Sequence, residues 1–194
     1  PPQPVFGHIR QVFSTANQTL GAVIMNALVI AVVLACAPQE SVGSDQDQQF
    51  QFKAGVARML ITPKEPIRMS GYAARSKPSE GVLHELWAKA IALEDRRGQK
   101  VVILTADLIA LSAELCQHVA AHLKAKHGLE RSQLLCNASH THSGPMVRRN
   151  LPVMEVGFDD AERQTITRYS DQLQVKLAEL CDAALADLKP ARLA

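Results

Sequence analysis

The sequence predicts an α/β domain in which a mixed sheet contains a βαβ unit and is flanked by helices. Two apolar runs, one in residues 100–105 and one in residues 133–139, have the length and composition of strands. Between them, leucine or valine recurs at every fourth position from Leu111 to Leu123, which is the spacing of one helix face. A strand, a helix and a second strand in this order form a right-handed crossover whose strands are parallel.

Residues 1–36 contain an apolar segment that runs from Leu20 to Cys36 and is interrupted only by Asn26. It is shorter than the about 20 residues that a membrane span needs, and it suits the hydrophobic part of an export signal. Its last four residues, Val33 to Cys36, resemble a bacterial lipobox. This predicts cleavage before Cys36, a lipid on that residue and a location in the bacterial cell envelope, or secretion. An uncleaved membrane anchor and a buried core helix are the alternatives.

Residues 37–50 are polar and rich in glutamine, which indicates a linker before a globular domain over residues 51–194. Strands are expected at residues 52–61 and 87–94, the second joined by a turn to the strand at 100–105. The long connection at residues 63–81 is rich in proline, glycine and serine. A loop of that length within a compact domain is usually functional.

The strand at 100–105 contains Val-Val-Ile-Leu without a polar residue, so we expect it to be buried on both faces. Ser112 is expected to cap the helix that follows, and Gly128 to end it. A second, long amphipathic helix is expected from Ile166 to Leu188, before Pro190.

The charge balance excludes some classes of partner. The chain carries 21 Lys and Arg against 19 Asp and Glu, with 4% aromatic residues, and no basic stripe is interleaved with aromatics. Nucleic acid is therefore not an expected partner. The spacing of the four cysteines fits no zinc ribbon. Cys116, Cys136 and Cys181 are expected to be buried thiols, and a disulfide between two of them stays open if the domain is exported.

His140 and His142 follow the strand at 133–139, and Gly144 and Pro145 then turn the chain. If the strand continues through them, both imidazoles point the same way, which is a natural start for a zinc site. A surface coincidence is the alternative. Asp107 follows the neighbouring strand, at the edge where ligands of such sheets gather. We expect it to orient an imidazole, or else to cap the following helix.

Other side chains are weaker candidates. His84 follows the long loop and either lines the site or packs beside Trp87. His118 and His122 have helical i, i+4 spacing without the glutamate of a zinc-protease helix, so we interpret them as a polar flank. Ser143 is not expected to be a nucleophile, because no G-x-S-x-G turn surrounds it.

Five segments in order resemble the neutral/alkaline, non-lysosomal ceramidases: Phe52–Ala57 with Ile61–Pro63, Met69–Tyr72, Gly81–Ala90, Thr105–Leu108 and Ser139–Pro145. The resemblance implies a zinc amidase that hydrolyses the N-acyl bond of ceramide, a lipid substrate, to sphingosine and a fatty acid. It implies that His140 ligates zinc and that His142 faces the substrate and the zinc-bound water. Bound zinc lowers the pKa of its water to about 7.

Two departures from the family pattern are present. Ser139 replaces a threonine, and Met146-Val147 replaces a Gly-Gly pair, which we expect to change the shape of the substrate mouth. The family's remaining zinc ligands and its serine-bearing loop would lie beyond Ala194, so the resemblance implies the front part of a longer enzyme. The alternatives are a zinc hydrolase of another amide or ester, and a non-catalytic binding domain tethered to the envelope.

Overall fold

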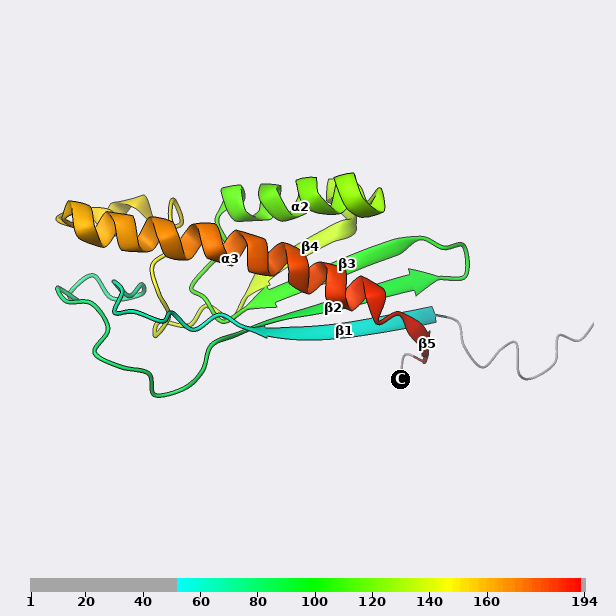
Figure 1. Cartoon of the computed structure of the whole chain (residues 1–194), viewed down its shortest axis with the longest axis horizontal. Coiled ribbons are helices and arrows are strands. Elements are labelled where there is room, and N and C mark those ends of the chain that lie inside the picture. Colours follow the sequence, from blue (N-terminus) through cyan, green and yellow to red (C-terminus); the bar gives the residue numbers. More distant parts are fainter. Residues whose placement is uncertain (1–51, 193–194) are drawn as a thin grey trace, which may run out of the picture. The chain divides into compact units, whose positions relative to one another are not determined.

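The computed structural model describes residues 52–192. Over this range the chain forms a five-stranded sheet with the strand order β4-β3-β2-β1-β5 (Figure 1). The strands are β1 (Phe52–Leu60), β2 (Trp87–Asp95), β3 (Lys100–Ala106), β4 (Leu134–Ala138) and β5 (Lys189–Ala191). The helices are α2 (Ala113–His127) and α3 (Asp160–Ala186), with short 3-10 turns η1 (Arg131–Gln133) and η2 (Pro152–Glu155). The export segment, Cys36 and the linker lie outside the described residues, so the predictions for them stay predictions.

The predicted βαβ unit is confirmed. β3 and β4 pair in parallel, from Val102 opposite Leu134 to Ala106 opposite Ala138, and α2 connects them. β1, β2 and β3 pair antiparallel, which makes the sheet mixed. The parallel pair ends its two strands at the same edge of the sheet, so the residues after Ala106 and after Ala138 start from neighbouring positions.

Local sequence signals place the helix ends. The Ser112 hydroxyl accepts a hydrogen bond from the backbone N–H of Leu115, and Gly128 takes the left-handed conformation (φ 69°) that ends α2. Both caps are as predicted. α3 begins at Asp160 rather than Ile166, because Asp159 and Glu162 form a reciprocal capping box that precedes the apolar periodicity. Among residues 52–192 we find no helix with the length and hydropathy to cross a bilayer.

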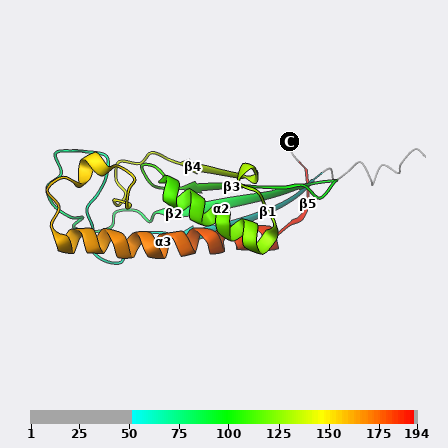
Figure 2. The same ribbon diagram turned by 90° about the horizontal axis from the view of Figure 1, so that it is seen from above.

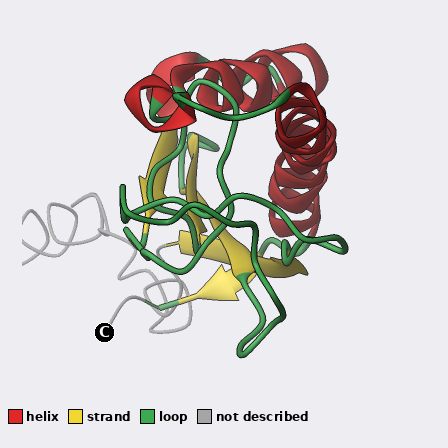
Figure 3. Cartoon of the chain, turned by 90° about the vertical axis from the view of Figure 1, so that its left-hand side faces the viewer, coloured by secondary structure: helices red, strands yellow, loops and turns green. Residues whose placement is uncertain are grey.

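Both helices lie on one side of the sheet, as Figures 1 and 3 show, and they lie in front of the strands when seen from above (Figure 2). Strand side chains that face them are buried, and every second residue faces away. The core therefore sits between one sheet face and the two helices. Its buried strand residues are Ala88, Ala90, Ala92, Val102, Leu104, Ala106 and Leu134.

The other face of the sheet is not covered by a described helix and carries an exposed apolar row. A row crosses four strands, because Val56 pairs with Ile91, Ile91 with Ile103, and Ile103 with Leu135. Val56 is 60% exposed and Leu135 59%. The prediction that the β3 run is buried on both faces is wrong. Val102 and Leu104 are buried but Val101 is 41% exposed, because neither described helix covers that side.

α3 is fixed to the sheet by direct backbone contact at Gly55. A Cβ on Gly55 would overlap the carbonyl oxygen of Ala184 and stand 2.8 Å from the carbonyl carbon of Asp187. The Asp187 carboxylate accepts a hydrogen bond of 3.0 Å from the backbone N–H of Val56. The chain then turns into β5, which pairs with β1. β5 had no counterpart in the sequence prediction.

Candidate metal centre

His140 and His142 lie in a turn and not on a strand. β4 ends at Ala138, and His140 has a left-handed backbone with φ 56°. The expectation that strand alternation aligns the two side chains is therefore wrong. The two rings nevertheless meet, with centroids 5.0 Å apart and planes at 69°. A left-handed turn at His140, and not the alternation of a strand, therefore brings the two imidazoles together.

One nitrogen of His140 already has a partner. Its Nδ1 lies 2.8 Å from the backbone carbonyl oxygen of Ile109. A carbonyl oxygen only accepts, so Nδ1 carries the proton and the neutral ring keeps its lone pair on Nε2. This is the arrangement in which protein imidazoles hold metals, because the bond at one nitrogen orients the other. Ile109 lies just past the end of β3, so the parallel strand pair positions this contact.

His142 packs against the long loop at residues 63–81. Its ring meets the Tyr72 ring edge to face, with centroids 5.0 Å apart. The backbone of Gly71 lies directly beneath it, and a Cβ there would stand 2.6 Å from His142 Cβ. Gly71 also has φ 104°, a region that residues with a Cβ rarely adopt. The loop that was expected to be functional therefore forms one wall of the histidine pair.

Backbone hydrogen bonds join this loop to the segment after the histidines. The Ser70 N–H donates to the Gly144 carbonyl at 3.0 Å, and the Met146 N–H donates to the Arg68 carbonyl at 2.7 Å. Ser70 is 1% exposed, and its hydroxyl reaches the carbonyls of Gly144 and Pro145. The two segments, more than 70 residues apart in the chain, form one rigid frame around His142.

Arg75 completes the frame, although it was not among the residues predicted from the sequence. Its Nη1 donates to the carbonyl oxygens of Ser70 (2.9 Å) and His142 (2.6 Å). Its guanidinium carbon lies 4.8 Å from the centre of the Tyr72 ring, within cation–π range. No sequence motif marks Arg75. The only available signal was its place in a long loop next to Met69–Tyr72.

Two predicted site residues are not joined to the histidines. The Asp107 carboxylate accepts a 3.0 Å hydrogen bond from the backbone N–H of Trp87, and the Asp107 N–H donates to the Trp87 carbonyl. Asp107 thus holds the end of β3 to the start of β2. His84 is exposed. Over residues 52–192, neither side chain has a hydrogen bond or ring contact with His140 or His142, so their predicted roles at the site stay predictions. The alternative that Asp107 caps the helix is wrong, because Ser112 is the N-cap of α2.

The two residues expected to shape a substrate mouth are instead part of the interior. Met146 and Val147 are each 1% exposed. Met146 packs with Ile67 and Ile166 in a small second core, and Val147 joins the main core. The replacement of the family's Gly-Gly pair by Met146-Val147 therefore changes the packing of the interior beneath the site.

The donor set fits part of a zinc site. His140 can offer Nε2 as one imidazole ligand, and the His142 ring lies beside it with its centre 5.0 Å away. Within residues 52–192 no group of three His, Cys, Asp or Glu side chains is placed to hold a metal. The described residues thus offer one or two ligands of the about three that a catalytic zinc takes from protein.

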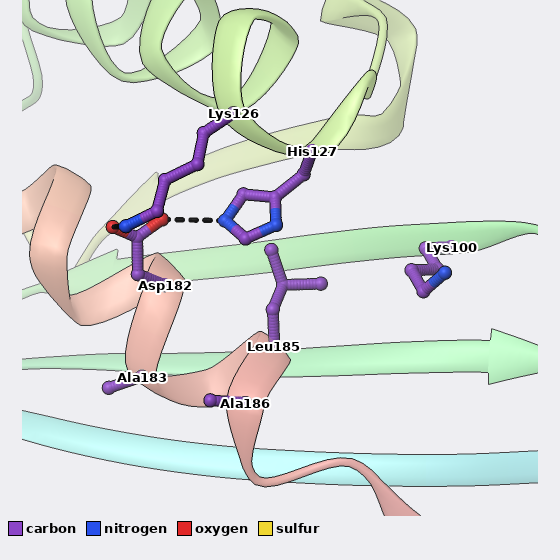
Figure 4. Close-up of a pocket in the computed structure, with 7 residues that line it drawn as sticks. All are labelled: Lys100, Lys126, His127, Asp182, Ala183, Leu185 and Ala186. Atoms are coloured by element: carbon purple, nitrogen blue, oxygen red, sulfur yellow. Dashed lines mark hydrogen bonds and ion pairs between the residues drawn. The ribbon is translucent and has the colours of Figure 1, made fainter.

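A different cluster of charged side chains lies near the start of β3, at the end of the strand away from the histidine pair. Asp182 of α3 receives hydrogen bonds from His122, Lys126 and His127 of α2. Burial alone would raise the pKa of Asp182, but the three hydrogen bonds outweigh this effect and lower the pKa to about 2. A pocket of about 440 Å³ beside the cluster is lined by Lys100, Lys126, His127, Asp182, Ala183, Leu185 and Ala186 (Figure 4). The predicted polar flank of α2 therefore has a structural partner in α3.

The fold and the site define an α/β domain that carries a framed pair of imidazoles at the carboxyl ends of two parallel strands. Residues 52–193 match the family "Neutral/alkaline non-lysosomal ceramidase, N-terminal". The chain belongs to this family.

Relatives with assigned names agree with this membership. The neutral ceramidase of Drosophila melanogaster is 30% identical over 97 residues, which is 48% of this chain and 14% of that protein. The neutral ceramidase of Pseudomonas aeruginosa is 28% identical over 123 residues, or 61% of this chain and 18% of that one. The crystal structure of neutral ceramidase from Pseudomonas aeruginosa superposes with a TM-score of 0.59 at 24% identity, over 73% of this chain and 22% of that chain. This chain thus spans less than a quarter of those proteins' lengths.

Proposed function

We propose that this chain is the N-terminal part of a zinc-dependent amidohydrolase that hydrolyses the N-acyl bond of ceramide to sphingosine and a fatty acid. The observation that carries the proposal is the hydrogen bond between His140 Nδ1 and the Ile109 carbonyl, which leaves Nε2 free beside the ring of His142. Membership of the ceramidase family supports the substrate class.

The proposal assigns different tasks to the two histidines. His140 holds the metal through Nε2. When bound, zinc polarises the amide carbonyl and lowers the pKa of a water molecule to about 7. His142 faces the reacting bond, where its imidazole would accept a proton and the imidazolium so formed would donate it to the leaving amine. Gly71, Tyr72 and Arg75 hold its ring and its backbone, so its position does not depend on the metal.

The proposal also includes where the enzyme works. A signal segment that ends at a lipidated Cys36 would tether the enzyme to the envelope membrane, next to a lipid substrate. Mass spectrometry of membrane-extracted protein from a bacterial host should show a mature chain that starts at Cys36 and carries acyl mass. An intact peptide across residues 33–37 as the main species would favour a plain anchor.

The test uses the full-length enzyme that contains this chain, with zinc content and hydrolysis of an N-acylsphingosine measured on each variant. His140→Ala should lose stoichiometric zinc and activity together. His142→Ala should keep most of the zinc and lose activity. His118→Ala is the matched control, because this exposed α2 residue lies outside the histidine pair and should leave both properties unchanged.

Two results would overturn the proposal. Equal zinc content in wild type and His140→Ala would remove the ligand assignment. Turnover of unrelated amides or esters, without turnover of any N-acylsphingosine in the same panel, would remove the substrate. A polypeptide of residues 50–194 alone should bind zinc weakly and hydrolyse no ceramide, because it supplies too few ligands. Tight one-to-one zinc binding by that polypeptide would show that the described residues complete a site.

A further inference from the structure

The carbonyl oxygen that lies against His140 Nδ1 belongs to a segment without regular secondary structure. Ile109 lies between the end of β3 at Ala106 and the start of α2 at Ala113. Residues 107–112 are neither helix nor strand, so no regular hydrogen-bond pattern orients their peptide groups. The direction of the Ile109 carbonyl, and with it the orientation of the His140 ring, therefore depends on the contacts that other segments make with residues 107–112.

The N-terminal side of this segment is held where β3 ends. The Ala106 carbonyl oxygen accepts hydrogen bonds from the backbone N–H groups of Leu108 (2.9 Å) and Ser139 (3.0 Å). The side chains of Leu108 and Ile109 are both buried. The chain that leads into the Ile109 carbonyl is therefore fixed, in part by the residue that directly precedes His140.

Asn150 holds the segment on the other side of Ile109. Its Nδ2 donates a hydrogen bond of 2.8 Å to the carbonyl oxygen of Ala110. A carbonyl oxygen only accepts, so the amide nitrogen of Asn150 faces it and not the amide oxygen. Ala110 directly follows Ile109 in the chain. His140 and Asn150 therefore bind the carbonyl oxygens of two successive residues.

Asn150 is itself held by the core and by both helices. Its backbone N–H donates to the carbonyl of the buried Val147 at 3.1 Å, which closes a turn. Within this turn, the Arg148 N–H donates to the hydroxyl of Ser170 in α3 at 2.9 Å. The Arg148 guanidinium also forms an ion pair of 2.6 Å with Glu114 in the first turn of α2. The amide that binds the Ala110 carbonyl therefore extends from an anchored turn.

We propose that Asn150 is a positioning residue for His140, because its hydrogen bond to Ala110 fixes the neighbouring Ile109 carbonyl. The inference rests on the proposed role of His140 as a zinc ligand. The Ile109 carbonyl keeps the ring proton on Nδ1 and directs Nε2 toward the metal. Without the Asn150 amide, residues 107–112 are held on one side of Ile109 only, and its carbonyl turns more freely. The His140 ring then spends part of its time in the other tautomer, and metal binding weakens although the ligand itself is unchanged.

The experiment compares Asn150→Ala with wild type in the full-length enzyme that contains this chain. Alanine removes the amide donor and adds no charge. The zinc dissociation constant, measured by competition with a chelator, should rise by about 10–100-fold, the range for loss of a residue that orients a ligating histidine. Asn150→Gln keeps an amide donor and should recover part of the affinity. Asn137→Ala is the matched control, because this exposed asparagine of β4 does not bind residues 107–112, and it should bind zinc as wild type does.

A second readout does not involve the metal. In zinc-free protein at alkaline pH, where imidazoles are neutral, NMR of isotope-labelled histidine reports which ring nitrogen carries the proton. The His140 signal, identified by its loss in His140→Ala, should show the proton on Nδ1 in wild type and a mixture of tautomers in Asn150→Ala. A purely structural role would lower the midpoint of urea unfolding and leave the tautomer and the zinc affinity as in wild type, and this result would overturn the positioning role.

His140→Ala separates this inference from the proposed function. If His140→Ala loses zinc while Asn150→Ala keeps the affinity and the tautomer of wild type, only the positioning role of Asn150 is wrong. If His140→Ala binds zinc as tightly as wild type, the ligand assignment of the proposed function is wrong, and the inference for Asn150 falls with it.

Discussion

The backbone of Gly71 lies directly against the side chain of His142, where a Cβ on the glycine would stand 2.6 Å from both Cβ and Cγ of the histidine. The loop at residues 63–81 and the turn that carries the two histidines are therefore one packed unit. The Met-Ser-Gly-Tyr segment of that loop has a physical task in this arrangement. Its glycine makes room for His142, and its tyrosine ring contacts the imidazole.

Gly71→Ala should displace His142 and reduce activity of the full-length enzyme strongly. The new Cβ meets the histidine and also forces a non-glycine residue to φ 104°, a strain of about 1–3 kcal/mol before the clash. Urea unfolding and activity measure the two effects. Gly81→Ala is the control, because a Cβ on that glycine of the same loop meets nothing within 4 Å. Equal loss in both variants would mean that loop composition, and not this contact, matters.

Arg75→Ala should lower the turnover number while zinc content stays near that of wild type. The substitution removes both hydrogen bonds that tie the carbonyls of Ser70 and His142 together, but it does not touch His140. Arg75→Lys should rescue only part of the activity, because lysine keeps the charge without the planar fork. Lys77→Ala changes an exposed cation of the same loop and should behave as wild type. Loss of zinc in Arg75→Ala would contradict separate roles for the two histidines.

Gly55→Ala should destabilise the domain by about 1–3 kcal/mol or more, the range for overpacking a close contact. The added methyl meets the backbone of Ala184, Asp187 and Leu188, and backbone cannot rotate away as a side chain can. The midpoint of urea unfolding measures the change. Gly81→Ala again supplies the control. An unchanged midpoint for Gly55→Ala would mean that α3 does not rest on β1 as described.

The pKa of Asp182 makes stability depend on pH in the acid range. Its folded value of about 2 is below the ordinary 3.8, so its stabilising effect is fully present above pH 3.8 and is lost as pH falls toward 2. Solvent screens this carboxylate, so the shift contributes at most about 2 kcal/mol to stability. Chemical unfolding between pH 5 and pH 2 should therefore show a decline in stability that Asp182→Asn makes smaller, and the variant should also lose some stability at neutral pH. Asp160→Asn, at an exposed aspartate of α3, should retain the decline. An identical pH profile for wild type and Asp182→Asn would contradict the role given to the hydrogen bonds between Asp182 of α3 and its partners on α2.

The open sheet face should make this chain self-associate when it is prepared alone. Val56, Ile91 and Leu135 form an exposed apolar row across neighbouring strands, and burial of such a row is favourable in water. Replacing Val56 and Leu135 together by threonine, which suits strands, should lower the association seen by sedimentation at rising concentration. Val175→Thr changes an exposed valine of α3 and should leave it unchanged. If the double substitution does not change the association, the surface through which the chains associate lies elsewhere.

Local signals in the sequence predicted most of the elements, although not β5, and the parallel pairing of β3 with β4. Apolar periodicity marked α2, Ser112 and Gly128 bounded it, and two apolar runs around it predicted the parallel strands β3 and β4. The His-Thr-His sequence also marked the candidate centre. These signals act between residues that are near in sequence, so they can be recognised without the structure.

Tertiary structure alone decided which face of the sheet the helices cover, how the two imidazoles meet and what surrounds them. An apolar run such as Val101–Leu104 is compatible with cover on one face or two, and only the packing of α2 and α3 chooses between them. Arg75 reaches His142 across 67 residues, and Asp107 takes the Trp87 backbone as its partner and not an imidazole. Contacts of this kind depend on how distant segments are brought together. No local pattern carries that information, because a hydrogen bond to a backbone carbonyl places no demand on the identity of the residue that supplies it.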